Sequence, residues 1–172
     1  GLAGILMALY RREKTGEGDY VDATMHDTLF SWTAHLSGPV FVDGVPPTTR
    51  DGRSIGGAAF YNVYETKDAR FIALTGREEK FATSLLTALG RPDLIELCKL
   101  DDCPAQEPVK AFLVQAFKEK TQSEWIEFLE PLELGWAPVL DMVEAFQQDH
   151  VKARNMILEE NSDILHVGNP IR

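Results

Sequence analysis

The stretch that decides the fold is GGAAFYNVYETKDARFIAL, residues 56–74. Two runs rich in aromatic and aliphatic side chains, 60–64 and 71–74, flank the polar segment 66–70. Apolar runs on both sides of a short polar turn are typical of an antiparallel hairpin. We therefore predict two paired strands here.

Helical periodicity dominates the sequence that follows the hairpin. Gly90 stands where the first apolar helical pattern stops, and Thr121 with Glu124 has the spacing of a capping box. Asp141 has the character of a helix cap. We predict helices over 81–89, 109–120, the segment from Thr121 to about 129, and 141–148, with one more strand over 136–140.

The sequence before the hairpin contains both helical spacing and strand-like alternation of apolar residues. Leu2, Ile5, Leu6 and Leu9 recur at helical spacing over 2–14, and a Gly-rich turn over 14–19 follows. We expect a short strand over 20–25, a helix over 27–36 and a long loop over 37–59, where Gly and Pro are frequent. Strands and helices that do not alternate regularly indicate an α+β fold.

Composition excludes several classes of protein. Hydrophobic residues make up 44% and charged residues 26%, as in ordinary globular domains. The 17 Lys and Arg against 27 Asp and Glu give a net charge of -10, which disfavours nucleic acid and anionic membranes as partners. No apolar run reaches the roughly 20 residues of a membrane span, and no signal peptide is recognised, so we expect a cytoplasmic protein. The chain opens inside a helical pattern without Met, which favours a piece of a longer protein.

Metal and disulfide chemistry find little support in the sequence. Cys98 and Cys103 match neither a zinc spacing nor a redox pair, so we expect two plain thiols in a reducing compartment. The four histidines are scattered, and none forms a ligand pair at helical spacing. We predict no metal site.

Two local patterns leave alternatives open. Glu78 and Glu79 stand where a helix begins after a strand, and the helix dipole alone favours carboxylates there. An enzyme that moves acyl groups or enolises a thioester could nonetheless use a carboxylate at this strand end for proton transfer. Gly56 and Gly57 are either a hinge or a backbone segment able to close over a ligand.

A longer run, ALYRREKTGEGDYVDATMHD at residues 8–27, resembles the signature of the family III CoA-transferases, the CaiB/BaiF group. Residues 56–64 and 78–81 resemble the same family, especially its α-methylacyl-CoA racemase branch. Similarity continues through Ala137–Leu140 and reaches Gly168–Pro170, so the resemblance covers essentially the whole chain.

The resemblance implies a parent of the α/β class that forms an interlocked homodimer. By this resemblance, residues 1–37 are the end of a large Rossmann-like CoA-binding domain, and residues 38–55 are a linker. Residues 56–151 are then a small α+β domain, and 152–172 return toward the large domain.

The resemblance also implies chemistry. Family transferases move CoA between carboxylic acids through an aspartyl-CoA intermediate, with no metal and no covalently bound cofactor; the acyl-CoA thioester is a substrate. Their catalytic aspartate corresponds to a position upstream of Gly1, so we expect these 172 residues alone to be inactive. Two alternatives stay open: a racemase-type isomerase, and a non-catalytic subunit or interaction module.

Five residues are carried over as site candidates. Glu78 is the catalytic candidate, and Tyr61 matches a residue that lines the racemase pocket. Met25 corresponds to a residue at the thiol end of CoA, although Met also serves as packing. Gly56 and Gly57 fall on the glycine loop that covers the family's active site. Glu79 stands where the family often has Pro, which is a local departure from the pattern.

Overall fold

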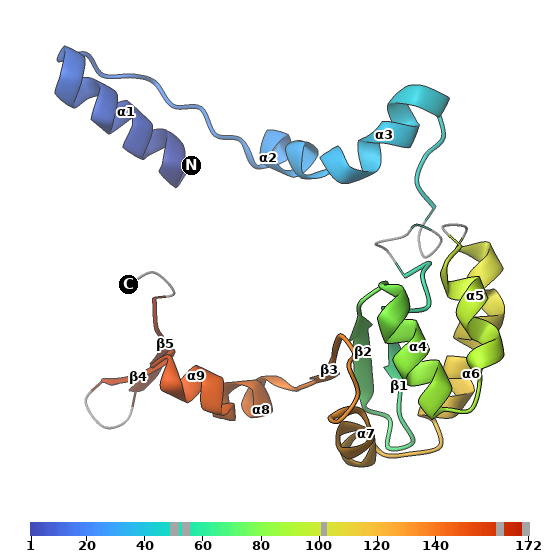
Figure 1. Cartoon of the computed structure of the whole chain (residues 1–172). Coiled ribbons are helices and arrows are strands. Elements are labelled where there is room, and N and C mark those ends of the chain that lie inside the picture. The colour runs from blue at the N-terminus through green and yellow to red at the C-terminus, as the bar shows by residue number, and fades with distance from the viewer. Residues whose placement is uncertain (49–51, 53–55, 101–102, 161–163, 170–172) are drawn as a thin grey trace. The chain divides into compact units, whose positions relative to one another are not determined.

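The computed structural model describes residues 1–48, 52, 56–100, 103–160 and 164–169 (Figure 1). The chain divides into two compact units, Gly1–Thr48 and Thr49–Arg172. The domain limits that the resemblance implies stay predictions.

The first unit contains three helices: α1 (Leu2–Thr15), α2 (Met25–Trp32) and α3 (Ala34–Asp43). Helix α1 agrees with the prediction. It ends at Gly16, whose φ of 77° is a left-handed conformation that a glycine adopts without strain. The Gly16 N–H donates to the Arg12 carbonyl at 2.8 Å and closes the helix.

The strand predicted over 20–25 is wrong. The structure has no ladder there, because no strand among the described residues pairs with this segment. Met25 is instead the first residue of α2, and Thr24 caps that helix by accepting a hydrogen bond from the Asp27 N–H at 3.1 Å.

The loop predicted from residue 37 starts too early. One helix was expected over 27–36, but α2 ends at Trp32, and α3 begins at Ala34 and continues to Asp43, with Pro39 inside it. A proline in a helix removes one N–H donor and usually marks a break. Here the chain tolerates it, and the helix ends at Gly44, whose φ is 66°.

The second unit contains the predicted hairpin. Strands β1 (Tyr61–Glu65) and β2 (Phe71–Thr75) pair antiparallel, and β3 (Trp136–Val139) pairs antiparallel with β2, so the sheet order is β1-β2-β3. The predicted strand over 136–140 is therefore confirmed. With the surrounding helices, this sheet confirms the α+β class.

Four of the helices in the second unit were predicted. They are α4 (Glu79–Ala88), α6 (Glu107–Phe117), α7 (Gln122–Leu129) and α8 (Met142–Gln147). Both expected caps form: Thr121 with Glu124 opens α7, and Asp141 with Glu144 opens α8 in the same reciprocal way.

Other elements of the second unit were not predicted. They are the short helices η1 (Pro92–Leu94), α5 (Ile95–Cys98), η2 (Pro104–Gln106) and α9 (Asp149–Ala153), and a separate hairpin of β4 (Ile157–Glu160) and β5 (Ile164–Val167). In the part of the chain that the structure describes, none of the helices has both the length and the apolar character of a membrane span.

The core lies on one face of the three-stranded sheet. Tyr64, Ile72 and Leu74 point into it and are almost fully buried. Phe117 of α6 stacks on Tyr64 with ring centroids 5.1 Å apart, and Trp125 of α7 lies 4.6 Å from Phe117. The indole N–H of Trp125 donates to the Phe117 carbonyl at 2.8 Å. The buried indole donor therefore has a hydrogen-bond acceptor.

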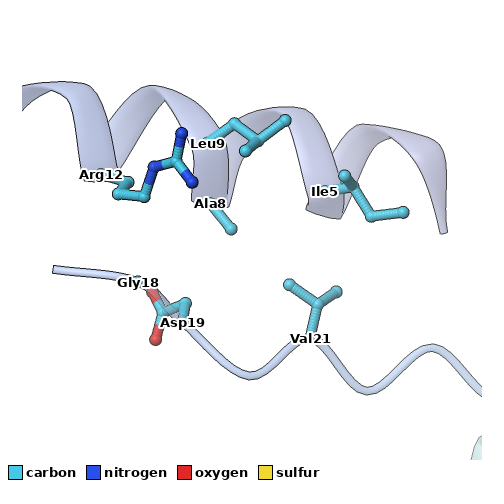
Figure 2. A pocket seen from close by; sticks show the side chains of 7 residues that line it. All are labelled: Ile5, Ala8, Leu9, Arg12, Gly18, Asp19 and Val21. Atoms are coloured by element: carbon cyan, nitrogen blue, oxygen red, sulfur yellow. The ribbon is translucent and has the colours of Figure 1, made fainter.

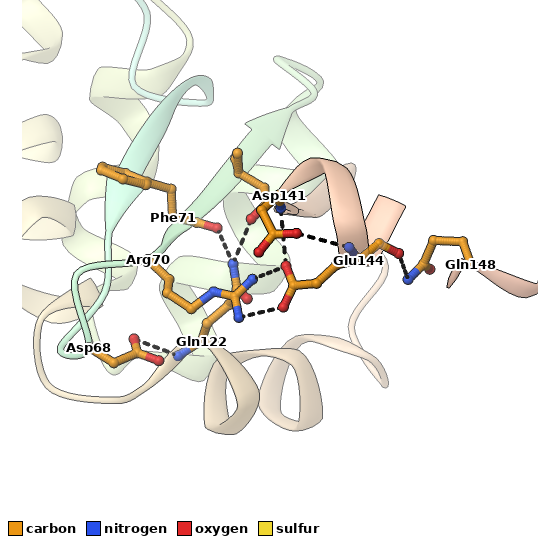
Figure 3. A network of polar contacts seen from close by, with 8 residues as sticks. Asp68, Arg70, Phe71, Gln122, Asp141, Glu144 and Gln148 are labelled. Carbon is orange, nitrogen blue, oxygen red and sulfur yellow. Dashed lines mark hydrogen bonds and ion pairs between the residues drawn. The ribbon is translucent and has the colours of Figure 1, made fainter. Parts of the chain in front are cut away.

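A polar network fastens α7 and α8 to the sheet (Figure 3). The buried Gln122 side chain donates to the carbonyls of Phe71 at 2.7 Å and Val139 at 3.1 Å, and so bridges β2 and β3. Arg70, just before β2, forms a two-pronged ion pair with Glu144 of α8. These contacts connect both helices to β2 and β3 and so hold the sheet in place.

Candidate functional site

Two residues with hydroxyl groups face each other across the strands at one end of the sheet. Tyr61 opens β1 and Thr75 closes β2, and the strand register places them directly opposite each other. Directly opposed residues of antiparallel strands project from the same face. Both residues are exposed, on the face opposite the core. Tyr61 and Thr75 are therefore neighbouring residues on the outer face of the sheet.

The backbone amides at this end do not bond to each other. The Tyr61 N–H donates to the Ala58 carbonyl at 3.2 Å, and the Thr75 N–H donates to the Gly135 carbonyl at 2.9 Å. The opposed pair is thus a non-hydrogen-bonded one, in which antiparallel strands bring side chains closest.

Glu78 follows β2 by three residues and is the N-cap residue of α4, with φ -64° and ψ 138°. Its carbonyl accepts from the Phe81 N–H at 3.0 Å, but its carboxylate makes no capping bond. The carboxylate lies over Gly76 instead: a methyl group placed on Gly76 would be 3.2 Å from Glu78 Oε2. The side chain is therefore exposed beside the end of β2 and not committed to its own helix.

A lysine next to this carboxylate is already paired. Lys80 forms an ion pair with Glu133. The hydrogen bond and the charge of Glu133 raise the pKa of Lys80, and the charge of Glu78 adds to the rise. Lys80 therefore stays a cation at neutral pH, and its primary partner is Glu133.

Two glycines allow the chain to pack closely at this end. A Cβ on Gly135 would stand 3.1 Å from Thr75 Oγ1 and 3.3 Å from the Gly76 nitrogen. A Cβ on Gly76 would stand 2.1 Å from the Phe81 ring. Gly135 therefore leaves no room for a side chain beside Thr75 and Gly76, and Gly76 leaves none beside the Phe81 ring.

The glycine segment before β1 is fixed to the core at its far end. Gly56 has a φ of 92°, a conformation that is strained for residues with a side chain. Its carbonyl accepts a hydrogen bond from Asn62 Nδ2 at 3.1 Å. Ala59 is fully buried: its N–H donates to Gln106 Oε1 at 3.0 Å, and its carbonyl accepts from the Tyr64 hydroxyl at 2.7 Å. Gly57 is buried as well. A role of Gly56 and Gly57 as an active-site cover stays a prediction.

Met25 belongs to the first unit, as the first residue of α2, and its side chain is 84% exposed. Its relation to Tyr61 and Glu78 stays a prediction, as does its contact with CoA. The first unit has a shallow pocket of its own between α1 and the extended segment after it (Figure 2). Seven residues line it: Ile5, Ala8, Leu9, Arg12, Gly18, Asp19 and Val21.

Sequence reasoning missed Thr75, Gly135 and Gln106 as parts of this region. Thr75 had a usable signal, since the register of the predicted hairpin places it across from Tyr61. Gly135 and Gln106 act through contacts with residues distant in sequence, which no local pattern reports.

The two cysteines are free, in agreement with the sequence prediction. Cys98 is half-buried, and its thiol donates to the Leu94 carbonyl at 3.6 Å. Burial raises the pKa of Cys98 to about 11, so the thiol is protonated at neutral pH. Among the described residues, no group of three or more His, Cys, Asp or Glu is arranged to hold a metal ion.

Comparison with known families gives one match over the full length. The model of "CoA-transferase family III" covers residues 1–172. Human α-methylacyl-CoA racemase is 32% identical over 94% of this chain and 42% of its own length. The acetyl-CoA:oxalate CoA-transferase of Acetobacter aceti is 27% identical over 98% of this chain and 44% of its own length.

Solved structures agree on the fold. A CAIB/BAIF family protein from Brucella suis superposes with a TM-score of 0.75 at 21% identity, covering 99% of this chain and 46% of that chain. A hypothetical protein from Mycobacterium tuberculosis gives a TM-score of 0.72 at 21% identity, with 99% and 45% coverage. The chain thus spans less than half the length of the proteins it matches.

Proposed function

The chain belongs to CoA-transferase family III, and from this premise we propose that the whole protein transfers coenzyme A between carboxylic acids. The observation that carries the proposal is the family match over all 172 residues. Relatives named as CoA-transferases support it, among them the Acetobacter aceti acetyl-CoA:oxalate enzyme and a succinyl-CoA–L-malate CoA-transferase β subunit from Chloroflexus aurantiacus.

The proposed reaction uses an aspartate that lies upstream of these residues. Its carboxylate attacks the donor thioester, forming an aspartyl–acyl mixed anhydride and releasing CoA thiolate. The thiolate then attacks the aspartyl carbonyl, which frees the donor acid and leaves an aspartyl-CoA thioester. The acceptor carboxylate and CoA repeat these two steps in reverse, so that acyl-CoA of the acceptor leaves and the aspartate is restored. Covalent catalysis of this kind divides one difficult exchange into easier steps.

The residues of this chain surround that centre in the proposal. Glu78 faces the reacting acyl group as a proton carrier or hydrogen-bond partner, a role for which its uncommitted carboxylate is suited. Tyr61 contacts the acyl group through its phenol. Gly56 and Gly57 cover the site, and Met25 lies near the thiol end of CoA. The working protein is proposed to be a cytoplasmic homodimer.

A second candidate is a racemase-type isomerase. It is favoured by the 32% identity to human α-methylacyl-CoA racemase and by the resemblance of Tyr61 and Glu78 to residues that line the racemase pocket. In this case the upstream aspartate works with a histidine as an acid–base pair. They remove and return the proton α to the thioester carbonyl.

One experiment separates the two candidates. The whole protein is incubated in D₂O with a 2-methylacyl-CoA donor and a set of carboxylic acids, and mass spectrometry follows both new acyl-CoA products and deuterium at the α carbon. A transferase forms acceptor acyl-CoA, and hydroxylamine added during turnover traps the activated aspartate as a hydroxamate. Deuterium uptake with no acceptor acyl-CoA would replace the proposal by the isomerase. The 172 residues alone serve as the inactive control, because loss of a nucleophile costs on the order of 10⁶ in rate.

A further inference from the structure

We infer that Asn62 is a positioning residue, which holds Gly56 in its positive-φ conformation and so keeps the glycine segment, residues 56–59, in a preformed shape. The inference rests on the proposed function, in which this segment covers the acyl-CoA site. It adds a residue to which the reaction proposed above gives no role.

Asn62 stands where the strand pattern favours an apolar side chain. It lies in β1 between the exposed Tyr61 and Val63, so its side chain leaves the face of the sheet that carries the core. Its Cα partner on β2 is Leu74, which is 2% exposed. Asn is disfavoured in strands, and a half-buried polar side chain on an inward face needs partners for its polar atoms. These partners indicate what Asn62 does.

Both ends of the Asn62 amide are engaged. Its Oδ1 accepts a hydrogen bond from the Val63 N–H at 2.9 Å, and its Nδ2 donates to the Gly56 carbonyl at 3.1 Å. Turning the amide over would set oxygen against oxygen and nitrogen against N–H, because the oxygen only accepts and the nitrogen only donates. The two bonds therefore support each other and fix the direction of the donor toward Gly56.

Gly56 is a residue that gains much from such a bond. Its φ is 92°, and glycine populates positive and negative φ about equally, so the residue itself does not select this conformation. Glycine also loses more conformational freedom on ordering than any other residue. The bond from Asn62 fixes the direction of the Gly56 carbonyl, and the next N–H, that of Gly57, donates to the Gly52 carbonyl at 3.1 Å.

The rest of the segment is held by the core. Ala58 and Ala59 are fully buried, and both the N–H and the carbonyl of Ala59 are hydrogen-bonded to side chains. Gly57 is buried, whereas Gly56 is only half-buried. Burial therefore fixes the segment from Ala59 back to Gly57, and Asn62 extends the fixed part to Gly56.

A preformed cover lowers the cost of binding a substrate. A segment that becomes ordered only when the substrate enters subtracts its ordering cost from the affinity. The apparent Kd rises in inverse proportion to the fraction of the protein that is in the binding-competent shape. Loss of the Asn62 bond lowers this fraction but leaves the reacting groups of the bound state unchanged. The role of Asn62 should therefore be visible in KM and not in kcat.

The test uses Asn62→Ala and Asn62→Asp in the whole protein, with the 2-methylacyl-CoA donor and both assays described above. Ala removes both bonds, whereas Asp keeps the acceptor for the Val63 N–H and removes only the donor to Gly56. Loss of one neutral hydrogen bond predicts a KM roughly three- to tenfold higher in both variants, with kcat within twofold of wild type. Gln115→Ala, exposed on α6, is the control and should leave both constants within twofold.

Hydrogen exchange gives a readout that does not depend on catalysis. Mass spectrometry of the whole protein without substrate should show faster exchange over residues 56–60 in both Asn62 variants. Exchange in the central strand β2 should stay at the wild-type rate, because the bond holds one segment and not the whole fold.

The outcomes separate this inference from the proposed function. Unchanged exchange over residues 56–60, or faster exchange there with an unchanged KM, overturns the role of Asn62 and leaves the proposed function standing. A lower kcat together with faster exchange in β2 indicates a general folding defect and also overturns the inference. A wild type that neither transfers CoA nor exchanges the α proton overturns the proposed function, and exchange over residues 56–60 then decides alone whether Asn62 holds the segment.

Discussion

Gln106 holds Ala59 in place: its Oε1 accepts the Ala59 N–H at 3.0 Å, and its Nε2 donates to the Leu100 carbonyl at 2.7 Å. Both Gln106 and Ala59 are almost fully buried. A single buried amide thus connects the glycine segment before β1 to the loop before α6. The position of Tyr61, two residues beyond Ala59, depends on this connection.

Replacing Gln106 with Leu should destabilise the fold by about 1–3 kcal/mol, because it leaves the buried Ala59 N–H without an acceptor. Urea unfolding measures the loss, and amide exchange at Ala59 should become faster. Gln115→Leu, on the exposed side of α6, is the control and should be close to neutral. Equal stability of the two variants would show that Gln106 is not the anchor.

The Arg70–Glu144 ion pair should make the attachment of α8 sensitive to acid. The hydrogen bond from Arg70, followed by that from the Asp141 N–H, lowers the pKa of Glu144. Because the pKa of Glu144 is lowered in the folded state, the ionised carboxylate contributes its full stabilisation above the ordinary glutamate pKa. This stabilisation is lost as the pH falls through the lowered value. Glu144→Gln should therefore weaken the attachment of α8 to the sheet at neutral pH. It should also make the stability of this attachment depend less on pH in the acid range.

Hydrogen exchange of the α8 amides at pH 7 and at acid pH measures this effect. Glu127→Gln, exposed on α7, is the matched control. A wild-type protein whose α8 protection does not change as the pH falls would contradict the assignment of Glu144.

Glu78→Gln in the whole protein should lower kcat about 10²-fold, the lower end of what a positioned proton-transfer group contributes. The neighbouring Glu79 is an informative control. Its carboxylate pairs with Lys99 at 2.9 Å, on the other side of the helix start, and Glu79→Gln should stay within twofold of wild type. Equal losses in both variants would indicate a general effect on α4 and remove Glu78 from the site.

Cys98 should react slowly with alkylating reagents in the folded protein. Its pKa of about 11 leaves so little thiolate at pH 8 that the rate should be roughly a hundredfold below that of the unfolded chain, where the thiol has its ordinary pKa. Iodoacetamide labelling followed by peptide mass spectrometry, with and without urea, measures the ratio. Similar rates in the two conditions would contradict the burial of this thiol.

Local patterns predicted the parts of the fold that local physics determines. The hairpin, the caps at Thr121 and Asp141, and the end of α4 near Gly90 follow from spacing over a few residues, and all are present. The strand expected over 20–25 failed because a strand needs a partner, and pairing is not a local property. Helix α3 was missed because Gly38 and Pro39 are usual breakers, yet the helix runs through them.

The candidate site divides in the same way. Tyr61 and Glu78 could be proposed from the family resemblance, and their roles stay predictions. Thr75 becomes visible only through the strand register, and Gly135 only through its contact with Thr75 across β2 and β3. Long-range contacts of this kind leave no periodic signal in the sequence.

The most direct test of the central claim is CoA transfer by the whole protein, followed with an isotopically labelled acceptor acid. We predict labelled acyl-CoA in step with loss of the donor thioester, and a hydroxylamine-trapped aspartate that lies outside these 172 residues. A whole protein that binds acyl-CoA yet forms no labelled acyl-CoA with any acceptor would contradict the account.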